Sequence, residues 1–228
     1  MNLATDNSNQ DDQATLERDP ILLEVIKNGL STIADEMALV IMRSAYSNIV
    51  RDSMDYSTAV CDYRGRTVAQ GLTNPVHLGS FPDAMRRLVE LHGAGMREGD
   101  VFLFNDPYGA GGMHLPDFYV IKPVFFGGTV AGYAATLAHQ ADVGGIAPGG
   151  MAVYAVDIYQ EGLRIPILKL VEAGVTNQAV LDLIARNTRL PNQVMGDIRA
   201  QIAACNNGEK AILDLLRRYG SRRFQFYC

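Results

Sequence analysis

The sequence predicts an α+β domain of mixed helices and antiparallel β-hairpins, with long helices near its N- and C-terminal ends. Apolar residues recur every three or four positions after Pro20 and again after Pro191, which is the spacing of amphipathic helices. Between these helices, apolar runs flank turn sequences such as Gly127-Gly128, which is typical of β-hairpins. The resulting order of helix, strands, helix, strands and helices is that of an α+β domain.

The N-terminal 18 residues differ in composition from the rest of the chain. Residues 1–18 are polar and acidic, so we expect a flexible acidic tail that buries too little surface to become ordered. Order is expected to begin at Asp19-Pro20, an N-cap acceptor followed by proline in the first helical position. The helix that follows should run to about Tyr46.

The remaining elements follow from apolar runs and from turn or capping residues. Ser80 is the expected N-cap of a middle helix, with Asp83 in the reciprocal capping position. In chain order we expect strands over 57–62 and 67–70, a helix over 81–91, a strand over 100–105, a loop over 106–116, strands over 118–126 and 129–138, a glycine-rich loop over 143–151, and helices over 178–186 and 191–219. Residues 221–228 are expected to be an irregular tail.

Size and composition exclude several classes of protein. With 228 residues, of which 48% are hydrophobic and 20% charged, the chain can bury a large core. The 20 Lys and Arg residues against 25 Asp and Glu give a net charge of −5, which does not favour a nucleic-acid partner. No apolar run is long enough for a membrane span, and no secretory signal pattern is seen. Three cysteines without metal-type spacing are typical of reduced thiols, so we expect a cytoplasmic protein. From the charge and the missing apolar span, we expect neither a membrane nor a nucleic-acid partner.

Histidines and a carboxylate gather beside glycine-rich loops. His114 and Asp117 precede one predicted strand, and His139 follows the next. Two imidazoles and a carboxylate suit a divalent metal such as Zn²⁺ or Mn²⁺ with open coordination positions. If Gly127-Gly128 is the whole turn, paired residue numbers add to 255, which sends Asp117 and His139 to opposite faces. A three-residue loop, or one bulge near a glycine, would place both on the same face.

The same residues also have structural interpretations. A His and an Asp in such a loop can form no more than a hydrogen-bonded turn, and His139 can bond a buried carbonyl group. His77 either packs beside the helix N-terminus or contacts a substrate. His92 suits the dipole at a helix C-terminus, and we assign it no function. Four further carboxylates qualify as a fourth ligand or a base, and the residues alone do not choose among Asp55, Asp62, Asp106 and Asp142.

Motifs for other chemistry are missing from the sequence. No Gly-x-Gly-x-x-Gly opens a helix after a strand, and there is no Walker-type Gly-Lys-Ser/Thr. No Gly-x-Ser-x-Gly elbow occurs, and Cys61 has no nearby His in the sequence. We therefore expect no nucleotide site on this chain.

An ordered series of longer motifs resembles the hydantoinase B/oxoprolinase family over residues 19–220. The series comprises residues 19–21 (DPI), 55–57 (DYS), 75–80 (PVHLGS), 105–108 (NDPY), 114–117 (HLPD), 138–145 (AHQADVGG) and 158–166 (IYQEGLRIP). The resemblance implies one domain over 19–220 that is incomplete relative to the longer chains of the family. It also implies that His114, Asp117, His139 and Asp55 are metal ligands.

The resemblance further implies a division of labour between two subunits. A partner A-type subunit binds ATP and phosphorylates the substrate, and the metal-dependent B-type subunit completes the opening of a cyclic amide such as a hydantoin or 5-oxoproline. In another branch of the family, ketones such as acetone or acetophenone are carboxylated. Gln140 stands where family members often have a second His. The shorter chain leaves a third interpretation, a truncated, catalytically inactive interaction fragment.

Overall fold

A seven-stranded antiparallel sheet forms the centre of the fold, which confirms the predicted α+β class. The computed structural model describes residues 19–228, and the predicted acidic tail lies outside them. The helices are α1 (Pro20–Ser44), α2 (Asn48–Arg51), α3 (Phe81–His92), α4 (Gln178–Arg186), α5 (Pro191–Tyr219) and α6 (Ser221–Tyr227), with short 3₁₀ helices η2 (Pro75–Gly79), η3 (Gly93–Gly95), η4 (Pro148–Gly150) and η5 (Ile158–Gln160). The strands, in their order across the sheet, are β2 (Thr67–Gln70), β1 (Tyr56–Asp62), β5 (Thr129–His139), β4 (Asp117–Phe126), β3 (Val101–Phe104), β6 (Leu168–Glu172) and β7 (Val175–Thr176).

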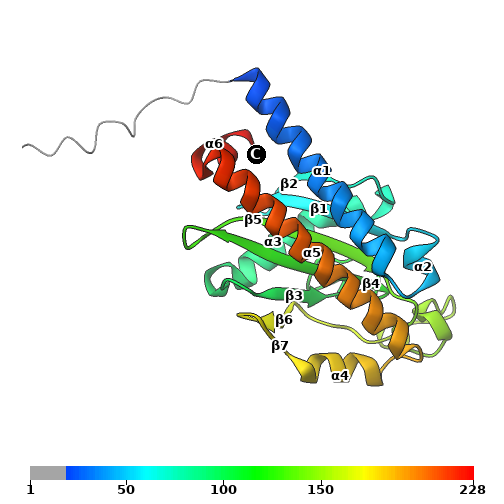
Figure 1. Ribbon diagram of the computed structural model, residues 1–228. Coiled ribbons are helices and arrows are strands. Elements are labelled where there is room, and N and C mark those ends of the chain that lie inside the picture. Colours follow the sequence, from blue (N-terminus) through cyan, green and yellow to red (C-terminus); the bar gives the residue numbers. More distant parts are fainter. Residues whose placement is uncertain (1–18) are drawn as a thin grey trace, which may run out of the picture.

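Helices cover both faces of the sheet, as Figure 1 shows. The long helices α1 and α5 pack on one face, where a core that includes Met37, Val120 and Ile198 is fully buried. Helix α3 packs on the other face. It covers Phe102, Tyr119 and the other strand side chains that point to that face. Strands β1, β4 and β5 are therefore buried on both sides, which makes the centre of the sheet the most constrained part of the chain.

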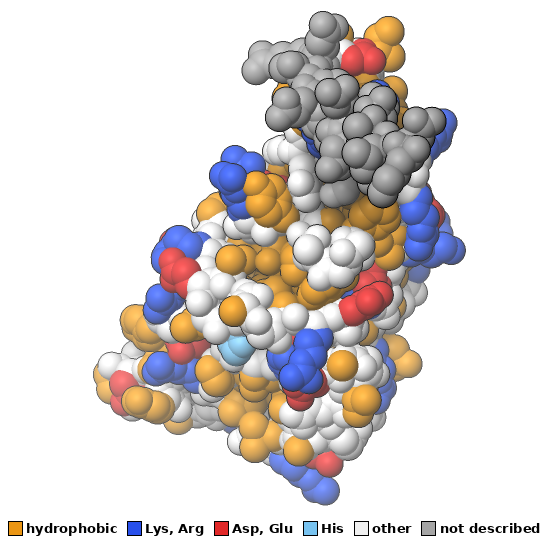
Figure 2. Space-filling model, turned by 90° about the vertical axis from the view of Figure 1, so that its left-hand side faces the viewer, with side chains coloured by type: hydrophobic (Ala, Val, Ile, Leu, Met, Phe, Trp, Pro, Cys, Tyr) orange, Lys and Arg blue, Asp and Glu red, His pale blue; other side chains and the backbone are white. Residues whose placement is uncertain are grey.

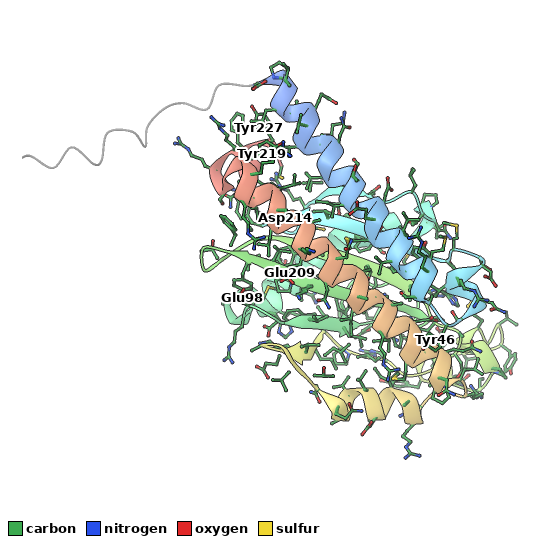
Figure 3. All side chains as sticks on the ribbon, in the orientation of Figure 1. Tyr46, Glu98, Glu209, Asp214, Tyr219 and Tyr227 are labelled. Carbon is green, nitrogen blue, oxygen red and sulfur yellow. The ribbon has the colours of Figure 1, made fainter. Side chains whose placement is uncertain are left out.

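The two long helices begin where the sequence predicts, and small residues set how closely α5 packs. Asp19 caps α1 by accepting hydrogen bonds from the backbone N–H groups of Ile21 and Leu22, and α1 ends at Ser44. Tyr46, labelled in Figure 3 beside the first turns of α5, lies against Gly196. The buried Asp197 carboxylate accepts hydrogen bonds from the backbone of Tyr46 and Ser47, which ties the end of α1 to α5.

The β4–β5 hairpin contains the bulge that the sequence allowed. Phe126 pairs with Thr129 and Phe125 with Val130, as a two-residue Gly127-Gly128 turn requires. The next pair is Val124 with Gly132, so Ala131 is an extra residue on β5 and the register shifts by one. Beyond the bulge, Asp117 pairs with His139.

Two expectations about local structure are wrong, and one hairpin was not predicted. Ser80 makes no capping bond, because its backbone is already helical where η2 runs into α3; its hydroxyl donates to the carbonyl of His77 instead. Residues 221–228 are not an irregular tail, since α6 folds back and buries Phe224. Residues 168–176, for which no strand was predicted, form the short hairpin β6–β7.

A membrane span requires a long apolar helix, and a nucleic-acid face requires clustered basic side chains; the helices and the surface charge of the described residues bear on both. No helix within residues 19–228 combines the length and apolarity that crossing a membrane requires. On the face shown in Figure 2, basic and acidic side chains lie side by side among hydrophobic ones, and the described residues form no basic stripe there.

Two glycines in the long helices should respond in opposite ways to the same added methyl group. Gly29→Ala should raise the free energy of unfolding by about 0.5–1 kcal/mol, because alanine favours helix and its Cβ would meet Leu215 at an ordinary 3.4 Å. Gly196→Ala should lower it by about 1–3 kcal/mol, because the methyl group would overlap the Tyr46 side chain. Urea unfolding followed by circular dichroism measures both, and a stabilising Gly196→Ala would contradict the packing described.

Candidate functional site

Main-chain pairing brings together the ends of three strands on which ligands were predicted. Asp117 is the first residue of β4 and pairs with His139, the last residue of β5. Asp55 immediately precedes β1, and its carbonyl accepts a hydrogen bond from the backbone N–H of His139 at 3.0 Å. On the other side, the N–H of Gln140 donates to the carbonyl of Pro116 at 2.8 Å. The backbone around the three residues is therefore fixed by the sheet.

The register places Asp117 and His139 on the same face of the sheet. Side chains alternate along a strand, so Asp117 shares the face of Tyr119, and His139 shares that of Leu137. Both Tyr119 and Leu137 belong to the core beneath α3. The predicted conflict of faces is resolved by the bulge, which was one of the two solutions proposed.

His114 approaches this strand end from the loop before β4. Its Nε2 lies 3.0 Å from Oδ1 of Asp117, and its ring centroid lies 5.1 Å from that of His139. A hydrogen bond from the backbone N–H of Asp117 to the carbonyl of His114 closes the connecting turn. All four predicted ligands thus line one pocket of about 360 Å³, together with Asn74, Val76, His77, Met113 and Met151.

The environment shifts the pKa values of His114 and His139 in opposite directions. The close approach of the Asp117 carboxylate raises the pKa of His114 above its usual value of 6.5. Burial lowers the pKa of His139, because a charged ring is poorly solvated there. At neutral pH His139 is therefore an uncharged imidazole with a lone pair available to an electrophile or a cation.

Unpaired buried atoms are concentrated in this pocket. Five buried side-chain atoms in residues 19–228 have no hydrogen-bond partner, and three of them are both carboxylate oxygens of Asp117 and Nδ1 of His139. Asp117 is only 1% exposed, and apart from the ion-pair contact of Oδ1 with His114 its oxygens have no donor, which is costly for a buried carboxylate. A bound cation would offset that cost, so the donor set fits a divalent metal.

The donors are gathered but do not form a closed ligand set. No group of three His, Cys, Asp or Glu side chains within residues 19–228 has already converged on a single ion position. His114 and Asp117 face each other directly instead, as an ion pair does. Binding an ion would require these side chains to turn toward a shared point, while the strands beneath them stay in place.

The hydrogen bonds of the four carboxylates that the sequence left open as a fourth ligand or a base separate them into two groups. Asp62 accepts hydrogen bonds from the backbone of Arg64 and Arg66 in the β1–β2 turn. Asp106 accepts one from Tyr108 and pairs with Arg164. These two therefore hold loops, and among the four only Asp55 and Asp142 remain to be compared.

The Asp142 carboxylate already accepts several hydrogen bonds from residues around the loop that follows β5. Its Oδ1 accepts from the backbone N–H of Gly149 and from the Arg189 guanidinium, and its Oδ2 accepts from the backbone N–H groups of Gly144 and Arg189. Burial alone would raise the pKa of Asp142, but these donated bonds outweigh it and hold the pKa below the usual 3.8. Asp142 fixes the glycine-rich loop, and Asp55 is the carboxylate that lines the pocket.

Two further polar residues in the pocket received no firm assignment from the sequence. His77 lies within it, which favours the substrate-contact interpretation over simple packing. Asn74 was missed, because an Asn before a proline is a common turn residue. Outside the pocket, His92 tilts against the ring of Phe102. The buried Gln140 side chain donates to the carbonyl of Ala138 and to Gln201, which belongs to α5, so it faces away from His139.

The chain is similar to known proteins over nearly all of its described length. The sequence profile of the family described as Hydantoinase B/oxoprolinase matches residues 19–228. The beta subunit of caprolactamase from Pseudomonas jessenii is 38% identical over 202 residues, which are 89% of this chain and 35% of that protein. The 5-oxoprolinase of Dictyostelium discoideum is 35% identical over 206 residues, which are 90% of this chain and 16% of that protein.

Solved structures share the fold. The crystal structure of the ATP-dependent caprolactamase from Pseudomonas jessenii superimposes with a TM-score of 0.87 at 36% identity, over 92% of this chain and 36% of that chain. A nucleotide-free acetone carboxylase gives a TM-score of 0.86 at 24% identity, over 92% of this chain and 28% of that one. The chain therefore spans about a third of the caprolactamase chain it matches.

Removing the charge of Asp142 should destabilise the fold in a pH-dependent way. Asp142→Asn should lower the free energy of unfolding near neutral pH by about 2–3 kcal/mol, because several donors to a charged acceptor are lost. Since the folded pKa of Asp142 is depressed, its contribution is present above the unfolded value of about 3.8 and is lost as the pH falls through the folded value. The difference from the parent should therefore shrink in acid.

Urea unfolding at a series of pH values measures this difference. Asp214→Asn serves as the control, since Asp214 is an exposed residue of α5, labelled in Figure 3, and should change stability by no more than about 0.5 kcal/mol. Equal losses in the two variants would contradict the structural role of Asp142.

Proposed function

Because this chain belongs to the hydantoinase B/oxoprolinase family, we propose that it is the metal-binding portion of a B-type subunit acting in the ATP-dependent opening of cyclic amides. The observation that carries the metal site is the set of unpaired buried atoms on Asp117 and His139. The family match and the similarity to a caprolactamase subunit support the substrate class, which we take to be hydantoins, 5-oxoproline or related lactams.

His114, Asp117, His139 and Asp55 would hold the metal. Two imidazoles and two carboxylates suit Zn²⁺ or Mn²⁺, and around an octahedral ion such as Mn²⁺ four donors leave positions for substrate. When bound, such an ion supplies a positive charge that polarises a carbonyl or phosphoryl oxygen. The sheet holds Asp117 and His139 in register, so little ordering of the backbone is needed when an ion or a substrate binds.

The other pocket residues would position the substrate. Val76, Met113 and Met151 give the pocket part of its lining as apolar surface, which suits the methylene groups of a lactam ring. Asp55 is more exposed than Asp117, with 29% of its side chain accessible, so it is the carboxylate that faces an incoming ligand. Thus the buried carboxylate would hold the ion, and the more open one would meet both ion and substrate.

We place ATP on a partner A-type subunit. The sequence of this chain has no glycine-rich nucleotide motif, whereas the caprolactamase that it resembles is ATP-dependent and its matched chain is a beta subunit. We also place the protein in the cytoplasm. The three cysteines are free, and Cys61 and Cys205 are buried, where burial raises the pKa of each thiol to about 12 and keeps it unreactive.

Ketone carboxylation is the second candidate activity, and an inactive interaction fragment is the third. The likeness to acetone carboxylase lies below a quarter identity, so it supports the fold rather than the reaction. The cyclic-amide proposal is preferred because a caprolactamase beta subunit and a 5-oxoprolinase are 38% and 35% identical to this chain.

Metal content of the purified chain tests the site directly. We expect near-stoichiometric Zn or Mn by elemental analysis, and loss of that metal in the double variant His114→Ala, His139→Ala, because both imidazole donors are removed. Added metal should also raise the melting temperature of the parent and leave that of the double variant unchanged.

His92→Ala is the matched control, since His92 lies outside the pocket and should leave the metal content at the parent level. If the parent chain contained no metal even after dialysis against Zn²⁺ and Mn²⁺, the proposed metal site would be wrong. Equal metal in the parent and the double variant would show that other residues bind it.

ADP release separates the proposed activities. With an A-type subunit from the same source, the chain should stimulate ADP release when a lactam or a hydantoin is added, and should not do so with a ketone and bicarbonate. Stimulation only by the ketone would favour the carboxylase. Association of the two subunits without ADP release from any substrate would favour the interaction fragment.

A further inference from the structure

His77 lines the pocket and is almost fully buried, and its ring lies near two of the proposed metal ligands. It is 3% exposed, and its Nε2 lies 3.3 Å from Oδ1 of Asp55 and 4.0 Å from Oδ1 of Asp117. The ring thus stands between two carboxylates that come from different strand ends. Asn74 donates from Nδ2 to the same Asp55 oxygen at 3.1 Å.

The other ring nitrogen is held by Ser57. Nδ1 of His77 lies 3.1 Å from the Ser57 hydroxyl oxygen, which in turn lies 2.7 Å from the carbonyl of Asn74. A carbonyl oxygen only accepts hydrogen bonds, so the single hydroxyl proton of Ser57 is committed to Asn74. Ser57 must therefore accept from His77, which places a proton on Nδ1.

The position of this proton determines what Nε2 presents. In the neutral ring, protonation of Nδ1 leaves the lone pair on Nε2. Nε2 faces Asp55 and Asp117, so a positive charge is needed between the ring and the carboxylates, and either a second ring proton or a bound ion supplies it. Donors to one ion at 2.0–2.2 Å stand about 3 Å apart or more, so the 3.3 Å separation of Nε2 and Asp55 suits a shared ion.

The backbone of His77 is also fixed. Both the N–H and the hydroxyl of Ser80 donate to its carbonyl, and the Tyr119 hydroxyl bonds that of Ser80. Asn74 caps η2 by accepting from Val76. A ring held at its main chain and at Nδ1 needs no rearrangement to keep Nε2 in the pocket.

We propose that His77 is a fifth donor of the metal site, with Nε2 as the ligand atom and Ser57 as the residue that positions it. The assignment rests on the proposed function, since it adds a residue to the site formed by Asp55, His114, Asp117 and His139. It predicts a site with three imidazoles, in which His77 and Asp55 form one side and His114 and His139 the other.

Metal affinity and the visible spectrum of the Co²⁺-loaded chain test the proposal. His77→Asn is the informative variant, because an Asn side chain can still donate to Ser57 while no atom reaches the pocket as Nε2 does. In competition with a chelator, we expect its affinity for Zn²⁺ and Co²⁺ to fall about tenfold or more, and the Co²⁺ spectrum to change. Added imidazole should partly restore both.

Two further variants make the outcome decisive. Ser57→Ala removes the positioning bond but no ligand, so it should weaken binding by less than His77→Asn does and keep the parent Co²⁺ spectrum. His92→Asn should behave as the parent, and circular dichroism checks that each variant is folded.

The results that overturn the assignment differ from those that overturn the proposed function. Parent-like affinity in folded His77→Asn, or weaker binding with an unchanged spectrum, would show that Nε2 is not a ligand, while the four-residue site stands. A parent chain that binds neither Zn²⁺ nor Co²⁺ would overturn the metal site and the role of His77 together.

Discussion

The register of the β4–β5 hairpin is the constraint on which the site depends. Without the extra residue Ala131, Asp117 and His139 would project from opposite faces of the sheet, and no shared pocket would exist. Gly132 is needed beside the bulge, because a Cβ there would approach the carbonyl oxygen of Cys61 on β1 to 2.7 Å. The unbroken pairing of β1 with β5 then places Asp55 next to His139 at the other end of these strands.

The strand end that carries these groups is braced from the opposite face of the sheet. Gln201 of α5 is fully buried and donates to the carbonyl of Phe118, and Thr136 donates to that of Val120. On the α5 side, the described residues leave one oxygen each of Gln140 and Asp197 without a partner, while their other polar atoms are bonded. On the face of α3, the unpaired atoms are both oxygens of Asp117 and Nδ1 of His139, and these lie together at one strand end. A scaffold fixed by hydrogen bonds thus supports a few groups whose charge and lone pairs are kept for a ligand.

Much of this arrangement could be predicted from the sequence, because the strongest signals are periodic. Regular apolar spacing marked α1 and α5, and Gly127-Gly128 marked the hairpin. The location of the bulge could not be predicted, since it depends on the contact between Gly132 and Cys61, which are far apart in the chain. The choice of Asp55 over Asp142 also required coordinates, because it depends on which carboxylate already accepts bonds from its surroundings. Short elements such as β6–β7 and α6 form mainly through tertiary packing, so their local patterns were too weak.

The outer strands of the sheet have a consequence for association. The sheet ends in β2, with four residues, and in β7, with two, so each edge offers only a short row of unpaired backbone groups. Long exposed edges recruit further strands and favour aggregation, and very short ones resist it. Growth of the sheet by strand addition is therefore disfavoured at both sides, and a partner that binds this domain would have to recognise its side chains and loops rather than extend its β-structure.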